Sequence, residues 1–376
     1  MNTLPPPLDL DLDIAESDPN FSSIEHSSLN KQVRESSMEL LRIISMSMIV
    51  ILHFLSHGIK PENLPGNLYY FLSPFFICGV NLFFLISGYF QVKYSIKGIL
   101  RLGLLVFFFG LVNQFLLYYF QGSLSVGNLI KLVLFPISGS PYWFLAVYFI
   151  LIIISPILNS FIKLLSIPQY NKFLIVFSFI TIYNCGFGFN YAGGLGYSLL
   201  QGIYLYLVGS YLRINREFLK QWNKFYFIGI FFASTLIDSI ANYYHPNPVF
   251  LSYNGIFVLI SSFALFIFFT RIKFHSRIVN SIATAALGCY LLQDGSFGNG
   301  FFYSYINEIY MNTSNLIEIL TKFSGIFMGF WILSWILTKI EKLWSVPLIN
   351  FIYDKTPKKI KSLFDLNLQP SSPSPK

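Results

Sequence analysis

The chain of 376 residues is 54% hydrophobic and only 11% charged, so it carries too few polar groups to cover a globular surface in water. Its net charge of +8 lies mainly in short connectors and tails, and no basic stripe is interleaved with stacking aromatics. The composition therefore excludes a soluble globular domain and a nucleic-acid-binding protein. It indicates a multi-pass membrane protein whose first partner is the lipid bilayer.

Residues 1–33 begin the chain with three consecutive prolines and a run of acidic residues. Such a segment cannot bury enough apolar surface to become ordered, so we expect a disordered acidic tail. A basic start followed at once by a short apolar core is missing, and we predict no cleavable signal peptide.

Apolar runs long enough to cross a bilayer follow one another through residues 34–345. They lie near residues 38–56, 69–90, 99–120, 142–164, 173–189, 196–212, 225–243, 249–270, 279–293 and 317–340. We therefore predict an all-α, polytopic bundle of about ten transmembrane helices in 34–345. A basic cytoplasmic tail is expected in 346–376.

The charge of the connectors gives this bundle an orientation. Cations gather in alternate connectors, at residues 31–34, 93–101, 163–172, 213–224, 271–277 and 355–361. By the positive-inside rule, this alternation requires ten crossings and places both termini in the cytoplasm. The segment 124–137 is apolar but too short to cross comfortably, so we expect an interfacial or re-entrant piece on the outer side.

The first predicted span contains Arg42 and His53, eleven residues apart. On a helix they share a face, about 20° and roughly 16 Å apart. An arginine near a helix centre costs roughly 2.5 to 3.5 kcal/mol on insertion scales, so we expect it to have a partner or a task. Arg42 offers a planar fork for phosphate or carboxylate, and His53 can take a proton from a hydroxyl near neutral pH.

Each of these two residues also has a structural explanation. Arg42 lies three residues after Glu39 on the same helix face, so the two side chains form an ion pair in that case. His53 would then hydrogen-bond a neighbouring helix and serve packing. The ion pair is compatible with the functional role of Arg42, and we keep both interpretations.

Polar residues in other spans are weaker candidates for a substrate groove. Asp238 either faces a wet cavity or pairs with another helix, small and polar residues near Ser87 permit close helix packing, and Trp143 also suits an interfacial anchor. With Glu39, the groove candidates so far are Asn81, Ser87, Asn113, Trp143 and Asp238. The three cysteines show neither a CxxC nor a Cys/His spacing, so we expect no disulfide framework and no metal site.

Four segments in order resemble motifs of the bacterial integral-membrane acyltransferases called the acyltransferase 3 family. They are Arg42-x10-His53, residues 79–90, residues 142–145 with 155–159, and residues 286–293. The resemblance covers most of residues 34–340. Asn81 stands where the family often has Asp, Gln293 stands where it often has His, and residues 97–101 only approximate its Arg-x-x-Arg connector. Gln293 joins the groove candidates, and without a histidine there the chain depends more heavily on His53.

The resemblance implies an O-acyltransferase of the bacterial inner membrane. Such an enzyme moves an acyl group, usually acetyl, from cytoplasmic acyl-coenzyme A to a sugar hydroxyl of a surface polysaccharide, lipopolysaccharide or peptidoglycan precursor. Acetyl-CoA is then a donor substrate, and no permanently bound cofactor is expected. The acceptor glycan, the length of the acyl group and the oligomeric state are left open by the sequence.

Our hypothesis is that Arg42, helped by Lys97 or Arg101, holds the phosphates or the polarised thioester of the donor. His53 then either deprotonates the acceptor hydroxyl or is itself acylated and passes the group on. The alternative is a non-enzymatic carrier, such as a flippase of lipid-linked sugars, with an ion and substrate pathway through the bundle. The intramembrane charges are few and concentrated on the first span, which favours a localised reaction centre.

Overall fold

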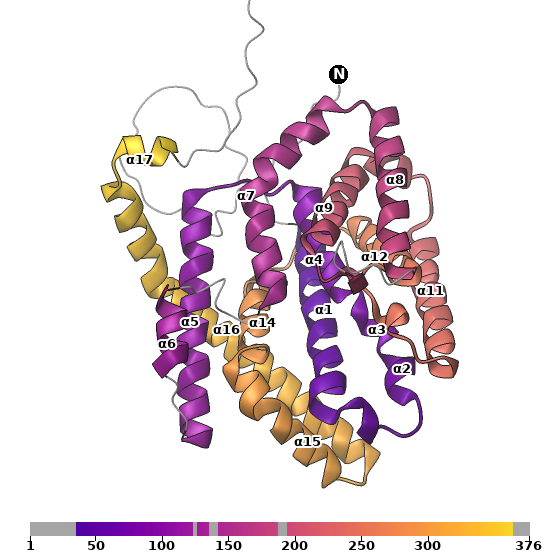
Figure 1. The fold of residues 1–376 in the computed structure, drawn as a ribbon, viewed down its shortest axis with the longest axis vertical. Helices are drawn as coiled ribbons and strands as arrows, with labels where there is room; N and C mark the ends of the chain where they lie inside the picture. Colours follow the sequence, from indigo (N-terminus) through magenta and orange to yellow (C-terminus); the bar gives the residue numbers. More distant parts are fainter. Residues whose placement is uncertain (1–34, 123–125, 135–141, 187–193, 364–376) are drawn as a thin grey trace, which may run out of the picture.

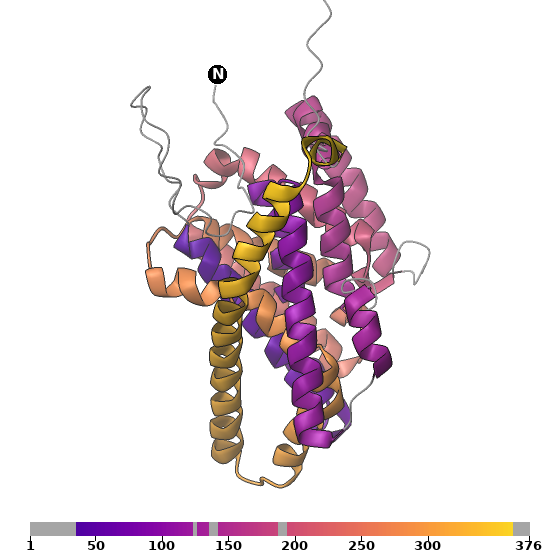
Figure 2. The same cartoon turned by 90° about the vertical axis from the view of Figure 1, so that its left-hand side faces the viewer.

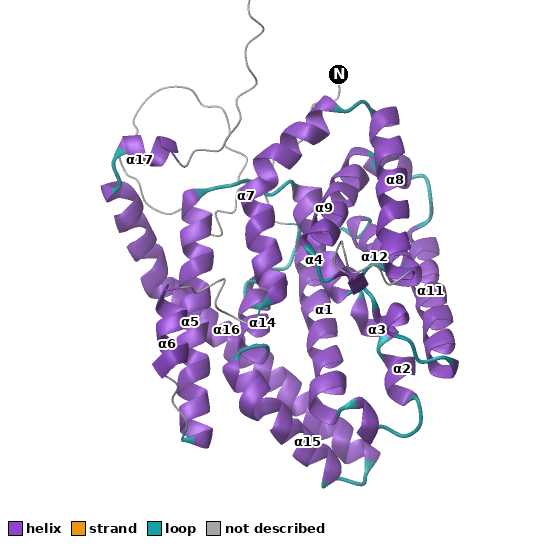
Figure 3. Ribbon diagram, viewed as in Figure 1, coloured by secondary structure: helices purple, strands orange, loops and turns teal. Residues whose placement is uncertain are grey.

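The computed structural model describes residues 35–122, 126–134, 142–186 and 194–363 (Figure 1). Within these ranges every regular element is a helix and no strand occurs (Figure 3). The prediction of an all-α fold is confirmed. The acidic segment 1–33 and the end of the C-terminal tail lie outside the described residues.

The helices are α1 (Ser36–His53), α2 (Leu68–Leu72), α3 (Pro74–Ile77), α4 (Gly79–Phe90), α5 (Ile96–Gln121), α6 (Val126–Leu134), α7 (Trp143–Leu164), α8 (Ile167–Gly186), α9 (Leu199–Ile214), α10 (Arg216–Leu219), α11 (Lys224–Tyr244), α12 (Ile256–Thr270), α13 (Arg277–Ala283), α14 (Ala286–Gln293), α15 (Tyr303–Met311), α16 (Leu316–Lys355) and α17 (Lys358–Leu363). Two π-helical turns are η1 (Phe54–Ile59) and η6 (Gly298–Phe302), and two of the 3₁₀ turns are η2 (Pro61–Asn63) and η5 (Pro248–Leu251).

Seven helical segments in the described residues are long and apolar enough to cross a membrane. They are Ser36–Ile59, Leu68–Phe90, Ile96–Gln121, Trp143–Leu164, Lys224–Tyr244, Pro248–Thr270 and Leu316–Lys355. The chain is therefore a multi-pass membrane protein. The other three predicted spans correspond to α8, which starts with polar residues, the short α9, and the pair α13 and α14, which a turn separates. The count of ten crossings and the cytoplasmic termini remain predictions.

The tightest helix contact joins α4 to α9. A Cβ atom added to Gly88 would lie 1.9 Å from the carbonyl oxygen of Tyr206, so only glycine fits there. Ser210 Oγ donates a hydrogen bond of 2.7 Å to the carbonyl of Gly88. Small residues that let two backbones approach are the usual basis of helix association in membranes. This contact fixes α4, against which α1 packs.

Three consecutive helices lie along another side of α1. α13 and α14 pack against α1 itself, and α15 packs against η1, the turn that continues α1 (Figure 1). Asn113 of α5 holds the turn after α14, because it donates a 3.0 Å hydrogen bond to the carbonyl of Leu291 and accepts one of 3.2 Å from the Phe297 amide. The chain from α13 to α15 thus follows α1 beyond both Arg42 and His53.

The last long helix, α16, runs to Lys355, past the predicted domain limit at residue 345. It packs against α5 and α14, and its C-terminal part lies beside the start of α5 (Figure 2). Within the predicted interfacial segment 124–137 the structure has the short helix α6, which packs against α5.

Candidate active site

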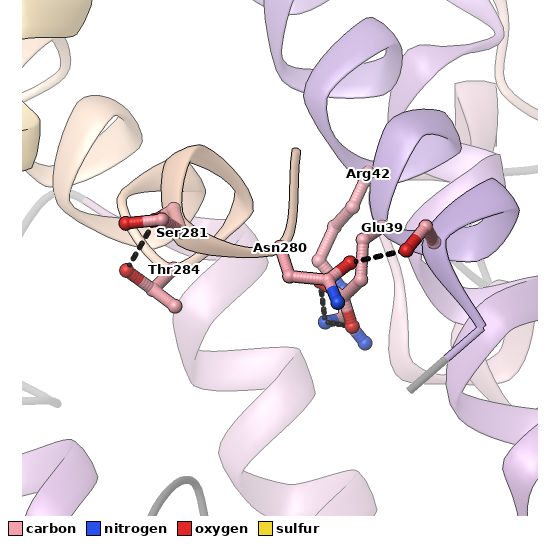
Figure 4. A network of polar contacts seen from close by, with 6 residues as sticks. Glu39, Arg42, Asn280, Ser281 and Thr284 are labelled. Atoms are coloured by element: carbon pink, nitrogen blue, oxygen red, sulfur yellow. Dashed lines mark hydrogen bonds and ion pairs between the residues drawn. The ribbon is translucent and has the colours of Figure 1, made fainter. Parts of the chain in front are cut away.

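Arg42 lies in the first half of α1 and forms an ion pair with Glu39. Its Nη1 atom is 2.9 Å from both carboxylate oxygens of Glu39 (Figure 4). The expected ion pair is therefore present, and it explains how α1 accommodates the charge. The Arg42 side chain remains 24% exposed, and a guanidinium has five N–H donors, so Arg42 keeps donors for a ligand.

Polar side chains from two other helices, α13 and α7, lie near this pair. Asn280 of α13 lies beside it and accepts a 2.8 Å hydrogen bond from Ser36 Oγ (Figure 4). Thr284 is the C-cap residue of α13, and its hydroxyl donates a hydrogen bond to the carbonyl of Ser281. From α7, the phenol of Tyr148 lies against Ser87 and within range of the Arg42 charge.

His53 ends α1, where the backbone widens into the π-helical turn η1. Its ring centroid is 5.1 Å from that of His57 and 6.4 Å from that of Tyr303 on α15. The Nδ1 atom of His53 is buried and has no hydrogen-bond partner in the part of the chain that the structure describes. Single π turns are frequent at functional sites, and this one sets two imidazoles and a phenol side by side.

The helix is unbroken between the two predicted catalytic residues. Because α1 is α-helical from Ser36 to His53, Arg42 and His53 lie about 20° apart around its axis and roughly 16 Å apart along it. Asn280 of α13 lies beside Arg42 and Tyr303 of α15 lies beside His53, and α14, between these two helices in the chain, also packs against α1. A positive charge and an imidazole thus lie at the two ends of one helix face.

A further polar group follows the end of α14. Gln293 is fully buried, and its side-chain oxygen and nitrogen find no hydrogen-bond partner among the described residues. Asp294 comes next, at the C-cap of α14. Its carboxylate interacts electrostatically with the phenols of Tyr290 and Tyr303. Burial raises the pKa of the Asp294 carboxyl to about 6.

Two cations predicted to help Arg42 interact with α16. Lys97 Nζ donates to Asn350 Oδ1 at 3.1 Å and lies 4.6 Å from the centroid of the Tyr353 ring. Arg101 interacts electrostatically with Glu341 of the same helix. These contacts hold α5 against α16, and a role beside the donor remains a prediction for both cations.

Most of the weaker groove candidates have structural partners. Asn81 donates to the Tyr253 carbonyl and to Ser262, at 2.8 and 3.1 Å, and so links α4 to α12. Ser87 Oγ donates to a carbonyl of its own helix. Asp238 is buried on α11, which packs against α12, α2 and α3. Trp143 lies against Tyr253, with ring centroids 5.4 Å apart.

An apolar hollow lies apart from these polar groups. A hollow of about 790 Å³ between α10 and α11 is lined almost wholly by apolar and aromatic side chains and contains none of the candidate residues. No group of three His, Cys, Asp or Glu side chains in the described ranges could hold a metal ion. The groups suited to chemistry are therefore those along α1, α14 and α15.

Five neighbours of the site were not predicted from the sequence: His57, Tyr148, Asn280, Asp294 and Tyr303. His57 could have been found, since it lies four residues after His53, one helical turn further on. Asp294 directly follows the recognised segment 286–293. The two tyrosines gave no signal among the 24 in the chain, because only the packing of α7 and α15 brings them to α1.

Fold and site together define a class of protein: a multi-pass helical membrane protein with a guanidinium and an imidazole on one helix face. The model of the acyltransferase 3 family, described as an acyltransferase domain, matches residues 35–341. The chain belongs to this family, and it is a membrane acyltransferase. No curated protein and no solved structure matches it.

Proposed function

We propose that the protein is an O-acyltransferase of the bacterial inner membrane. It transfers an acetyl group from cytoplasmic acetyl-CoA to a sugar hydroxyl of a cell-surface polysaccharide, lipopolysaccharide or related glycan. The observation that carries the proposal is the unbroken α1 helix, which holds the partly exposed Arg42 and, on the same face, His53 with an Nδ1 atom that has no hydrogen-bond partner among the described residues. Membership of the acyltransferase family supports the acyl transfer itself.

Arg42 is suited to the donor. Its guanidinium can bind a phosphate or the carbonyl oxygen of the thioester through N–H groups that Glu39 leaves unused. The Asn280 amide and the Tyr148 hydroxyl add polar groups next to it. Coenzyme A carries its phosphates and its thioester at opposite ends of a long flexible arm. A donor of this shape matches a site with a charge at one end and a reacting group further along the helix.

His53 is suited to the acceptor. Its free ring nitrogen takes the proton of a sugar hydroxyl as the oxygen attacks the thioester carbon. A C–O bond forms, the C–S bond breaks, and the leaving thiolate takes up a proton to give free coenzyme A. In the alternative route the imidazole is acylated first and the sugar oxygen then attacks the acyl-imidazole. Both routes use the same geometry and give the same products.

The test is a transfer assay with acetyl-labelled coenzyme A and proteoliposomes that contain the protein. We expect the wild type to move label into a surface glycan of the host, and His53→Ala to lower the rate by about 10²- to 10⁴-fold, the usual contribution of a general base. His275→Ala is the matched control, because His275 is exposed beyond α12 and should leave the rate unchanged.

The competing function is a carrier of lipid-linked sugars. Absence of label transfer by the wild type, together with movement of unmodified lipid-linked sugar across the proteoliposome membrane, would establish the carrier and overturn the transferase.

A further inference from the structure

Buried polar groups without partners mark the end of α14. The side-chain oxygen and nitrogen of Gln293 and the hydroxyl of Tyr303 are buried and make no hydrogen bond to any described residue. An unsatisfied buried polar group costs about 1 to 3 kcal/mol, and each such group in a native protein calls for an explanation. A ligand that supplies donors and acceptors at this place is one.

Asp294 adds a carboxylate to these groups. Its charge acts on four phenols from four separate segments, those of Tyr142, Tyr253, Tyr290 and Tyr303. Asp294 is partly exposed, and Asn299 and Gly300 after it are exposed, so a solute can reach the carboxylate. Asp294, Gln293, Tyr290 and Tyr303 are called the Asp294 cluster below.

Aromatic rings adjoin the Asp294 cluster: the Tyr290 ring lies 5.6 Å from those of Tyr142 and Phe144, and Phe144 lies 6.3 Å from Trp143, measured between centroids. Tyr253 is within 4.8 Å of Tyr197 and 5.4 Å of Trp143, measured between ring centroids, and Trp143 and Tyr197 are also 4.8 Å apart. Tyr197 is 50% exposed. Ligand sites combine apolar aromatic walls with a few placed polar groups. Aromatic faces beside a carboxylate and an amide fit a sugar, which has C–H faces and several hydroxyl groups.

The position of the Asp294 cluster suits binding of the acceptor and not of the donor. Tyr303 lies 6.4 Å from His53, ring to ring, so the cluster adjoins the imidazole. A carboxylate repels the phosphates of coenzyme A, whereas an ionised carboxylate accepts strong hydrogen bonds from hydroxyl groups. A donor at Arg42 and a sugar at Asp294 would meet at His53.

We propose that the Asp294 cluster is the acceptor subsite and that it binds an uncharged sugar ring, with Asp294 and Gln293 bonded to neighbouring hydroxyls and one hydroxyl presented to His53. This inference rests on the proposed transferase function and names the part of the site that selects the sugar. It predicts discrimination against acidic sugars, because a second carboxylate beside Asp294 is repelled.

The experiment measures the KM for each substrate in proteoliposomes. The donor is labelled acetyl-CoA, and the acceptors are host surface glycan, methyl glucoside and methyl glucuronide. For Asp294→Asn we expect the acceptor KM to rise about tenfold or more, the effect of weakening a hydrogen bond to a charged group, and for Tyr303→Phe about three- to tenfold, the effect of losing a neutral one. The donor KM should change less than about twofold in both variants. For Asp294→Asn the preference for glucoside over glucuronide should also shrink.

Tyr170→Phe is the matched control. Tyr170 is a buried tyrosine whose hydroxyl donates to the Leu207 carbonyl between α8 and α9, so its variant should keep both KM values. Thermal unfolding in detergent shows whether each variant is folded. If Asp294→Asn does not fold, Tyr303→Phe, which removes only one oxygen atom, tests the acceptor subsite in its place.

The outcomes separate the two proposals. An unchanged acceptor KM and an unchanged glucoside preference in the folded variants would overturn the acceptor subsite and leave the transferase intact. An equal rise in donor and acceptor KM would overturn it too, since a general distortion affects both. A wild type that transfers no label to any glycan refutes the transferase itself.

Discussion

Arg42 has a structural partner in Glu39 and, in the proposed function, a chemical role as well. Its pair with Glu39 neutralises the charge inside α1 but occupies only Nη1. A single ion pair of this kind needs a positive charge but not the planar guanidinium group with its several N–H donors. The donor, with phosphates or a thioester carbonyl, is the ligand that needs several N–H groups in fixed positions.

Arg42→Lys separates these roles. Lysine keeps the charge for Glu39 and loses the fork, so we expect the KM for acetyl-CoA to rise at least about tenfold, which corresponds to about 1.4 kcal/mol of binding free energy. Arg216→Lys is the control, because Arg216 forms a comparable pair with Glu217 at an exposed position, 3.3 Å apart. Full retention of donor affinity in Arg42→Lys would mean that Arg42 only balances Glu39.

At the level of the helices, the contact between α4 and α9 supports the site. α4 carries Ser87, which touches Tyr148, and it packs against α1. The carbonyl of Tyr206 occupies the place of a Cβ atom at Gly88. A larger residue there must push α4 and α9 apart, and the movement reaches the surroundings of Arg42.

Gly88→Ala is therefore expected to destabilise the protein by about 1 to 3 kcal/mol or more, as overpacking does, and to lower its thermal midpoint in detergent. Gly103→Ala is the control, since a Cβ atom at Gly103 of α5 meets nothing within 4 Å and alanine favours a helix by about 1 kcal/mol. Equal midpoints for the two variants would show that the close contact contributes nothing to stability.

The sequence predicted those features that depend on local repetition. The spacing of Arg42 and His53, the long apolar spans and the all-α class all follow from helix period and hydropathy, and the structure has them. The break between α13 and α14 and the π turn after His53 depend on packing against α1 and α15. Asp294 and Tyr303 become neighbours only through these breaks, so no periodic pattern pointed to them.

For the whole molecule, the positions of α13 and α14 decide how the site faces the membrane. The seven long apolar segments do not include this pair, whereas the alternation of charged connectors requires it to cross. If it crosses, the chain after α14, including Asp294 and α15, faces the side opposite to Lys220. If it does not, the chain after α14 lies on the same side as Lys220, which is incompatible with an Asp294 cluster that adjoins His53 at the far end of α1.

Single cysteines introduced at exposed positions distinguish these topologies. Met311, at the end of α15, and Lys220, in the connector after α10, are both exposed. With ten crossings, Met311→Cys reacts with a membrane-impermeant maleimide in intact spheroplasts, while Lys220→Cys reacts only after permeabilisation. His245→Cys, exposed after α11, is the outer control, and the parent protein gives the background of its native thiols. Labelling of Met311→Cys only after permeabilisation would contradict ten crossings. It would place the end of α15 on the cytoplasmic side, opposite to the end of α1 that carries His53, and so would contradict the proposed arrangement of donor and acceptor.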